Sequence, residues 1–169
     1  MKSYSFNKIG FFVDISTFSC NSYQNGSIID DVGGNNMKVS SKGRYALRIM
    51  IDLAMNDNGN FISLKEIAER NGMSMKYSEQ IVSMLNKAGY LQTARGNNGG
   101  YKLNRKPEEY KVGDILRASE GDLAPIMCLE EDGVCTRKEN CITYSFWEGL
   151  DKAINDYVDS KTLADLIRK

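Results

Sequence analysis

Three cysteines lie within fourteen residues of one another and are the side chains best suited to chemistry: Cys128, Cys135 and Cys141. The 169-residue chain has four cysteines and no histidine. Thiolates bind soft metals and iron–sulfur clusters, and they are also oxidised reversibly. In a reducing cytosol, clustered thiols more often serve as metal, cluster or redox groups than as disulfides, and an odd trio cannot pair fully with itself.

The spacing of the trio is C-x6-C-x5-C, which differs from the C-x2-C pairs of zinc fingers and bacterial ferredoxins. Wide spacing suits a loop wrapped around an iron–sulfur cluster. A zinc ion held by three thiolates and a carboxylate or water is a second interpretation. Three unrelated reduced thiols are a third.

Several classes of protein are excluded by what the sequence lacks. Without histidine there is no Ser/His/Asp or Cys/His catalytic set, and neither a G-x-G-x-x-G nor a Walker-type loop occurs, so we expect no enzyme. No apolar run approaches the ~18–20 residues of a membrane span. The run at residues 9–13 is too short for a signal peptide, so the sequence favours a cytoplasmic protein that contacts no membrane.

Charge is unevenly distributed although the net charge is zero. Residues 38–103 contain ten Lys/Arg and five Asp/Glu, a balance of +5, whereas residues 104–169 contain ten and fourteen, a balance of −4. A basic module beside an acidic one is typical of a protein in which only one part meets phosphates.

The first 36 residues differ from the rest of the chain in composition. They are rich in Ser, Asn, Gly and Phe and show no helical periodicity. We interpret residues 1–36 as a tail outside the fold, with Met37 as a candidate for the true translation start. Cys20 belongs to this tail and is interpreted as an unliganded thiol.

The middle of the chain has the pattern of a helix-turn-helix. Residues 41–56 form one apolar stripe, and a second helix begins at the capping box Ser63 to Glu66 and ends at Gly72. Ser74 caps a third helix, predicted to bury Tyr77, Ile81, Met84, Leu85 and Ala88.

Two short strands follow, at residues 90–93 and 101–103, joined by a glycine-rich tip with an Asn98-Gly99 hairpin signal. The pattern predicts a mainly α fold with a small β-hairpin wing, a winged helix-turn-helix over residues 37–105. The third helix would then enter the major groove of double-stranded DNA. The groups predicted to contact DNA are Ser74, Lys76, Tyr77, Glu79, Arg95 and Gly96. A protein-binding helix pair is the alternative.

The last third of the sequence divides at the cysteines. Residues 106–141 are predicted to form a linker helix and a cysteine-bearing sensor loop, and residues 142–169 a dimerisation helix with a C-terminal tail. Trp147, Leu150, Ile154 and Tyr157 recur at +3, +4 and +3, which is the a/d seam of a paired helix. We therefore expect a homodimer.

These motifs together resemble the Rrf2 family of bacterial transcription regulators, which includes IscR, NsrR and CymR. The resemblance rests on residues 37–47, the helix-turn-helix at 67–80, the wing at 95–101, and the three cysteines followed by Phe146-Trp147. It covers residues 37–160 and is nearest to the IscR-like branch. It implies a homodimeric regulator, expected to be a repressor, that binds promoter operators. It also implies that the DNA affinity responds to an iron–sulfur cluster, and [2Fe–2S] is favoured over [4Fe–4S].

In that resemblance Ser74, Lys76, Tyr77 and Arg95 match DNA-contacting positions, and Glu79 a position that selects operators. The ligand set departs from the family pattern. Tyr144 stands where IscR-like members have a histidine ligand, and Arg44 stands where NsrR-like members have an aspartate. The fourth ligand stays open among Glu130, Glu131, Asp132 and Glu139. A cluster-free regulator, controlled by thiol oxidation or by a protein of cysteine metabolism, is the alternative.

Overall fold

The computed structural model describes residues 39–168, apart from 97, 131–132, 134 and 136–137. The expected tail at 1–36, with Cys20 and Met37, lies outside these residues, as do Glu131 and Asp132. The elements, in chain order, are α1 (Ser41–Met55), α2 (Leu64–Asn71), α3 (Met75–Lys87), β1 (Leu91–Ala94), β2 (Gly100–Leu103), α4 (Val112–Glu120), α5 (Tyr144–Asp159) and α6 (Leu163–Ile167), with single 3-10 turns at Pro107–Glu109, Met127–Leu129 and Lys138–Asn140.

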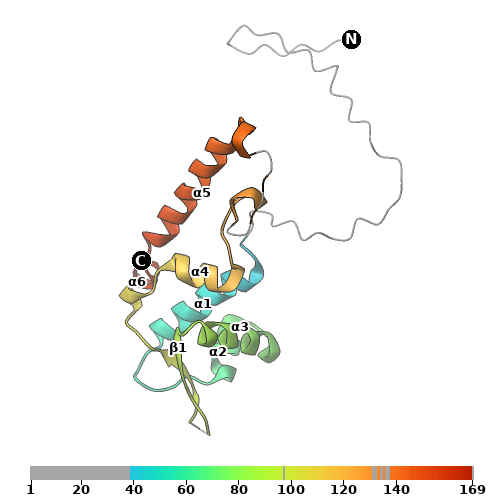
Figure 1. Cartoon of the computed structure of the whole chain (residues 1–169). Helices are drawn as coiled ribbons and strands as arrows, with labels where there is room; N and C mark the ends of the chain where they lie inside the picture. The colour runs from blue at the N-terminus through green and yellow to red at the C-terminus, as the bar shows by residue number, and fades with distance from the viewer. Residues whose placement is uncertain (1–38, 97, 131–132, 134, 136–137, 169) are drawn as a thin grey trace, which may run out of the picture. The chain divides into compact units, whose positions relative to one another are not determined.

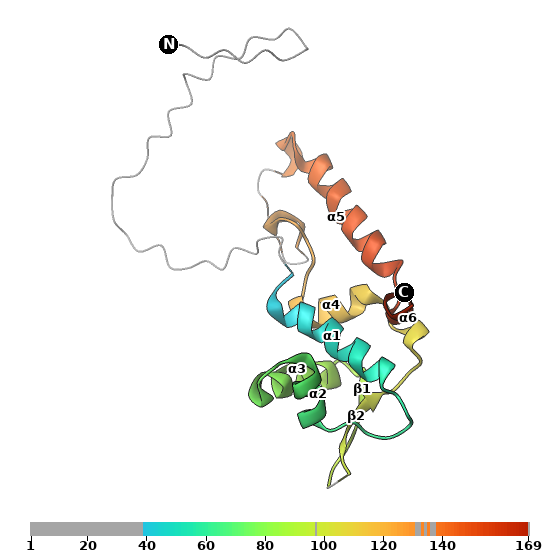
Figure 2. The same cartoon turned by 180° about the vertical axis from the view of Figure 1, so that it is seen from behind.

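Helix α1 is the centre of the fold, because it contacts α2 and α3 on one side and α4 on the other (Figures 1 and 2). Its predicted apolar stripe is buried, and Ser40 caps its first turn by accepting from the backbone of Lys42 at 3.0 Å. The core gathers one side chain or more from nearly every element: Ala46, Ile49, Met50, Leu53, Ile62, Ile67, Ile81, Val82, Leu85, Leu91, Tyr110, Ile115 and Leu163.

The β-hairpin follows α3 directly and is antiparallel, with Leu91 opposite Leu103 and Ala94 opposite Gly100. A single bridge from Ile62 to Tyr101 attaches it to the segment before α2. The expected mainly α fold with a hairpin wing and a long C-terminal helix is confirmed; β1 begins and ends one residue later than predicted, and β2 begins one residue earlier.

Three local predictions were wrong. In α3 the buried residues include Ser78 and Val82, whereas Ala88 is exposed because the helix ends at Lys87. Helix α5 begins at Tyr144 rather than at Ile142, because Ile142 and Thr143 form a turn before it. The Thr143 hydroxyl lies 3.4 Å from the Cys141 sulfur and makes no capping hydrogen bond.

The end of the chain also differs from the expected tail. Thr162 and Asp165 form a capping box that starts α6, and Leu163 of this helix is fully buried in the core. The backbone of Leu163 donates to the carbonyl of Tyr110 at 2.9 Å. The segment after α5 therefore closes the same core that holds the helix-turn-helix.

Candidate DNA-binding surface and cysteine loop

Local hydrogen bonds that the sequence predicts fix the start of α2 and the turn that leads into α3. The Ser63 hydroxyl accepts from the backbone of Glu66 at 3.3 Å, and the Glu66 carboxylate accepts from the Ser63 hydroxyl at 2.7 Å and from the Ser63 backbone at 2.9 Å. The hydrogen bonds from the Ser63 hydroxyl and backbone lower the pKa of Glu66. Gly72 ends α2 in the left-handed conformation with φ of 64°, and the Ser74 hydroxyl caps α3 by accepting from Tyr77.

Helix α2 is held against α1 by an ion pair. The Arg70 guanidinium donates to both carboxylate oxygens of Asp52, at 2.7 and 2.9 Å. This hydrogen bonding raises the pKa of Arg70. Because α3 follows α2 after a short turn, the Arg70–Asp52 ion pair also helps to fix the position of α3 relative to α1.

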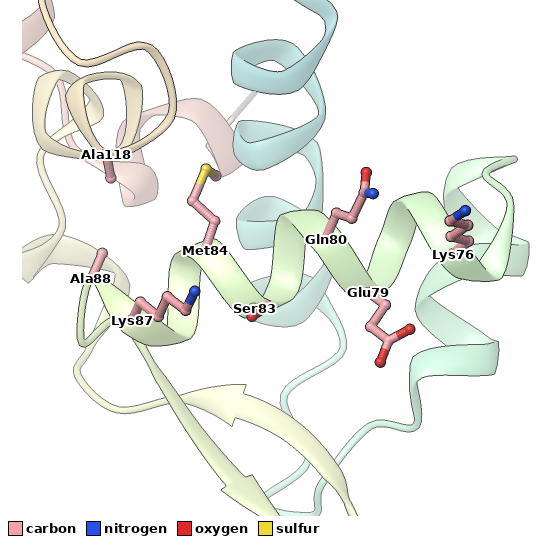
Figure 3. Close-up of a pocket in the computed structure, with 8 residues that line it drawn as sticks. All are labelled: Lys76, Glu79, Gln80, Ser83, Met84, Lys87, Ala88 and Ala118. Carbon is pink, nitrogen blue, oxygen red and sulfur yellow. The ribbon is translucent and has the colours of Figure 1, made fainter.

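The outward face of α3 forms an open groove of about 800 Å³, shown in Figure 3. Gln80 and Met84 point toward one side of the helix in that view, and Glu79 points toward the other. Lys76, Glu79 and Gln80 are exposed, so their polar groups are available to a ligand on this face. The residues that line the groove are Lys76, Glu79, Gln80, Ser83, Met84, Lys87, Ala88 and Ala118.

Ser74 and Tyr77, also predicted to contact DNA, have structural roles in addition. The Ser74 hydroxyl is used as the cap of α3, although the residue is exposed. Tyr77 is half-buried and packs edge-on against Tyr45, with ring centroids 5.7 Å apart. Both residues therefore also stabilise the N-terminal turn that presents Lys76.

The wing brings Arg95 beside α3. A second groove of about 460 Å³ lies between helix and hairpin, and both Glu79 and Arg95 line it. Gly96 occupies the tip with φ of 102°, a conformation that residues with a side chain rarely adopt, and its carbonyl accepts from Gly99 at 2.9 Å. Predicted groups from α3 and from the wing thus line one shared groove.

Four polar residues of this second groove are absent from the predicted DNA contacts: Ser83, Asn86, Thr93 and Tyr101. Asn86 follows Ser83 by three residues on α3, so helical spacing places it next on the same face. Thr93 could be located only by knowing the hairpin register. Periodicity along one element cannot indicate which residues of another element lie opposite.

The three predicted thiols are half-buried and free of disulfides. Cys128 lies in the 3-10 turn Met127–Leu129, and Cys141 follows the turn Lys138–Asn140. The carbonyl of Cys141 accepts from the backbone of Tyr144 at 3.2 Å, so this cysteine is joined to the first turn of α5. The Thr143 hydroxyl beside its sulfur lowers the pKa of the Cys141 thiol.

The ring of Tyr144 contacts the ammonium group of a lysine. The Lys138 ammonium lies 4.9 Å from the centre of the Tyr144 ring. A hydrogen bond with Tyr144 is the largest cause of the raised pKa of Lys138, and Cys128 contributes a smaller attraction. Arg44 donates to the Ser41 hydroxyl at 3.0 Å.

Thiolates have the right chemistry for an iron–sulfur cluster, but the described residues do not by themselves assemble a site. Within the described ranges, no group of three or more His, Cys, Asp or Glu side chains lies close enough to hold a metal ion. Two of the candidate fourth ligands, Glu131 and Asp132, lie outside the described residues. Among the described side chains, the three thiols are not grouped with a fourth ligand.

The helix-turn-helix, the hairpin beside it and the exposed polar face of α3 define a winged-helix protein. The sequence matches the family model Rrf2, described as an iron-dependent transcriptional regulator, over residues 39–169. The chain belongs to the Rrf2 family of transcriptional regulators.

Three relatives illustrate this similarity. The protein rrf2 of Nitratidesulfovibrio vulgaris is 40% identical over 132 residues, covering 78% of this chain and 88% of the relative. The structure of CymR, called the global cysteine regulator of B. subtilis, matches with a TM-score of 0.62 and 40% identity, over 77% of this chain and 95% of that one. T. potens IscR matches with a TM-score of 0.62 and 43% identity, over 78% and 86%.

The family model and the IscR and CymR relatives are named as transcriptional regulators, which agrees with the expectation that the chain is not an enzyme. No helix in the described part of the chain combines the length and apolarity that crossing a bilayer requires.

Proposed function

We propose that this protein is a cytoplasmic homodimer that binds promoter DNA and regulates transcription according to the state of three thiols. The observation that carries the DNA-binding part is the shared groove, in which α3 and the wing meet at Glu79 and Arg95. Lys76 and Arg95 would contact phosphates, and Glu79 would accept from cytosine N4 in the major groove. Ser74, Tyr77 and the backbone of Gly96 complete the proposed contact set.

The homodimer is supported by the exposure of α5. In the described part of the chain none of its side chains is buried, although one face is apolar. Phe146 is 64% exposed and Tyr157 65% exposed, while Trp147 is half-buried. An amphipathic helix with its apolar face open to solvent is stabilised by pairing with a second copy.

Control by the thiols is supported by the connection between Cys141 and α5. A change of state at Cys128, Cys135 and Cys141 would act on the first turn of the proposed dimer helix. The state itself has two candidates. One is an iron–sulfur cluster, [2Fe–2S] ahead of [4Fe–4S], which is supported by the similarity to IscR.

The second candidate is reversible thiol oxidation without a cluster, or regulation by a partner protein. It is supported by the similarity to a cysteine regulator, whose TM-score of 0.62 equals that of the IscR structure. The lowered pKa of Cys141 favours its oxidation, because the thiolate is the reactive form.

An absorption spectrum of protein purified without oxygen, with iron and sulfide counts, separates the two candidates. Visible absorption that disappears on changing any of the three cysteines to alanine supports the cluster. A colourless protein after anaerobic reconstitution with iron and sulfide rejects the cluster and leaves the thiol switch. Cys20→Ala is the matched control, because the sequence places that cysteine outside the trio.

A further inference from the structure

Arg117 of α4 joins the winged-helix body to α5. Its guanidinium donates to both carboxylate oxygens of Asp159, each at 2.9 Å, and to the amide oxygen of Asn155 at 2.8 Å. The Arg117 side chain is 33% exposed and that of Asp159 is 35% exposed. A guanidinium fork that meets a carboxylate with two hydrogen bonds fixes orientation as well as distance.

Gly113 allows α4 and α5 to approach closely enough for this contact. A Cβ atom added there would lie 2.0 Å from the Asp159 Oδ1 and 2.9 Å from the Arg117 Nη1. Any side chain at this position must displace the ion pair. Arg117 and Gly113 therefore offer two chemically unrelated ways to disturb one contact.

Backbone contacts hold the same end of α5. The amide of Val112 donates to the carbonyl of Lys161 at 2.9 Å, and Lys111 and Thr162 form an antiparallel bridge. Helix α6 then anchors the chain through Leu163 in the core, beside the C-terminal end of α5 (Figure 2). The position of α5 is thus fixed at its C-terminal end, next to α4.

We propose that Arg117, with Asp159 and Asn155, is a positioning group that sets the angle of α5 and thereby the half-site spacing that the dimer accepts. This inference rests on the proposed function, because α5 sets a spacing only if it forms the dimer interface. The two winged-helix domains of a dimer bind one duplex together only if their separation matches that of its half-sites. A rigid connection makes one spacing favourable, whereas a loose one tolerates several.

The Arg117–Asp159 contact is expected to affect DNA spacing more than the stability of the fold. A half-exposed ion pair adds little to the stability of a fold, since solvent screens it and two long side chains lose freedom. Loss of this contact should therefore change the preference among spacers more than it changes affinity for an isolated half-site.

The experiment uses the full chain and duplex DNA. Selection from a random duplex pool first identifies the half-sites and spacer that the wild type prefers. Affinities are then measured for duplexes whose spacers are lengthened or shortened by single base pairs, and for a duplex with one half-site. Sedimentation reports the oligomeric state of each variant.

Arg117→Met and Gly113→Ala should remain dimers with wild-type affinity for one half-site, yet lose about tenfold of their preference for the best spacer. Arg117→Lys, which keeps the charge without the fork, should restore part of the preference. Lys152→Met is the matched control, because Lys152 pairs with Asp156 inside α5 and touches no other element through that pair.

An unchanged spacer preference in both Arg117→Met and Gly113→Ala overturns the proposal. Should either variant fail to fold, Asp159→Asn removes the charge at constant size and must show the same loss. A wild type that is monomeric or binds no paired half-sites contradicts the proposed function itself, and that result is visible before any variant is made.

Discussion

Ser78 is the residue whose burial is least explained by its chemistry. Its side chain is fully buried in α3, and its hydroxyl has no hydrogen-bond partner among the residues described. Burying an unpaired hydroxyl costs roughly 1–3 kcal/mol. Ser78→Ala should therefore raise the free energy of unfolding by about 1 kcal/mol, measured by urea denaturation.

The change should leave DNA affinity unaltered, because Ser78 faces the core. Ser83→Ala, on the exposed side of the same helix, is the control for the effect of helix propensity. A clear loss of stability in Ser78→Ala would mean that the hydroxyl is satisfied, and that its small volume is not the only reason for serine there.

Lys76 and Glu79 should differ in what they contribute to DNA binding. Lys76→Ala should weaken binding to all sequences alike and reduce the slope of log K against log salt by about 1, as the loss of one phosphate contact does. Glu79→Ala should instead alter which base is accepted, by about 1–3 kcal/mol of discrimination at one position. Binding curves across salt and operator variants measure both.

The proposed roles of the two residues would be contradicted if Glu79→Ala weakened binding to all sequences alike, or if Lys76→Ala changed the preferred base. Lys65→Ala is a suitable control for charge, because that residue pairs with Glu69 within α2 and lines neither groove.

At the scale of elements, much of the fold could be predicted because its signals are local. The apolar stripe of α1, the capping box at Ser63 and the glycine after α2 each depend on neighbours within a few residues. The shift of the buried stripe of α3 toward Ser78 and Val82 could not be predicted, since α1, α2, α4 and β1 all pack against that helix. Helix α6 was missed because five residues carry too little periodicity.

The contact between α4 and α5 predicts a pH dependence. Hydrogen bonding to Arg117 lowers the pKa of Asp159 in the folded state. A carboxyl group whose pKa is lower in the folded than in the unfolded state stabilises the fold at pH values above its unfolded-state pKa, which is about 4. This stabilisation is lost as pH falls through the lower folded-state pKa. The stability advantage of the wild type over Asp159→Asn should be constant near neutral pH and shrink below about pH 4.

Urea denaturation of both proteins across this pH range measures the difference. If the wild type remained more stable than Asp159→Asn at the lowest pH, the contact between Arg117 and residue 159 would not depend on the charge of Asp159. Asp156→Asn serves as the control, because its pair with Lys152 is exposed and lies within one helix.

At the scale of the whole molecule, the proposed dimer depends on the apolar face of α5. Leu150→Glu should raise the dimer dissociation constant by more than about a hundredfold, because an unpaired carboxylate buried at the seam costs roughly 3–5 kcal/mol. Sedimentation should show monomers while circular dichroism retains the helical signal. Ser145→Glu adds the same charge at an exposed position off the seam and should leave the dimer intact.

The candidate site was predictable in part for the same physical reasons. The α3 face at Lys76 and Glu79 follows from helical spacing, and the structure exposes both. The role of Arg117 could not be predicted, because its partner Asp159 lies 42 residues away on a helix whose packing the sequence does not specify. The thiols were found by count and spacing, yet neither indicates where the three sulfurs lie relative to one another.

The most direct test of thiol control is the DNA affinity of one protein in different thiol states. Promoter DNA binding is measured by fluorescence anisotropy for anaerobic reduced, iron–sulfide-reconstituted and oxidised protein, alongside the triple alanine variant of Cys128, Cys135 and Cys141. With thiol control, affinity should differ between at least two states by about 5–150-fold, the usual range of coupling between sites, and the variant should abolish the difference. Equal affinity in every state, with the variant binding as the wild type does, would contradict thiol control.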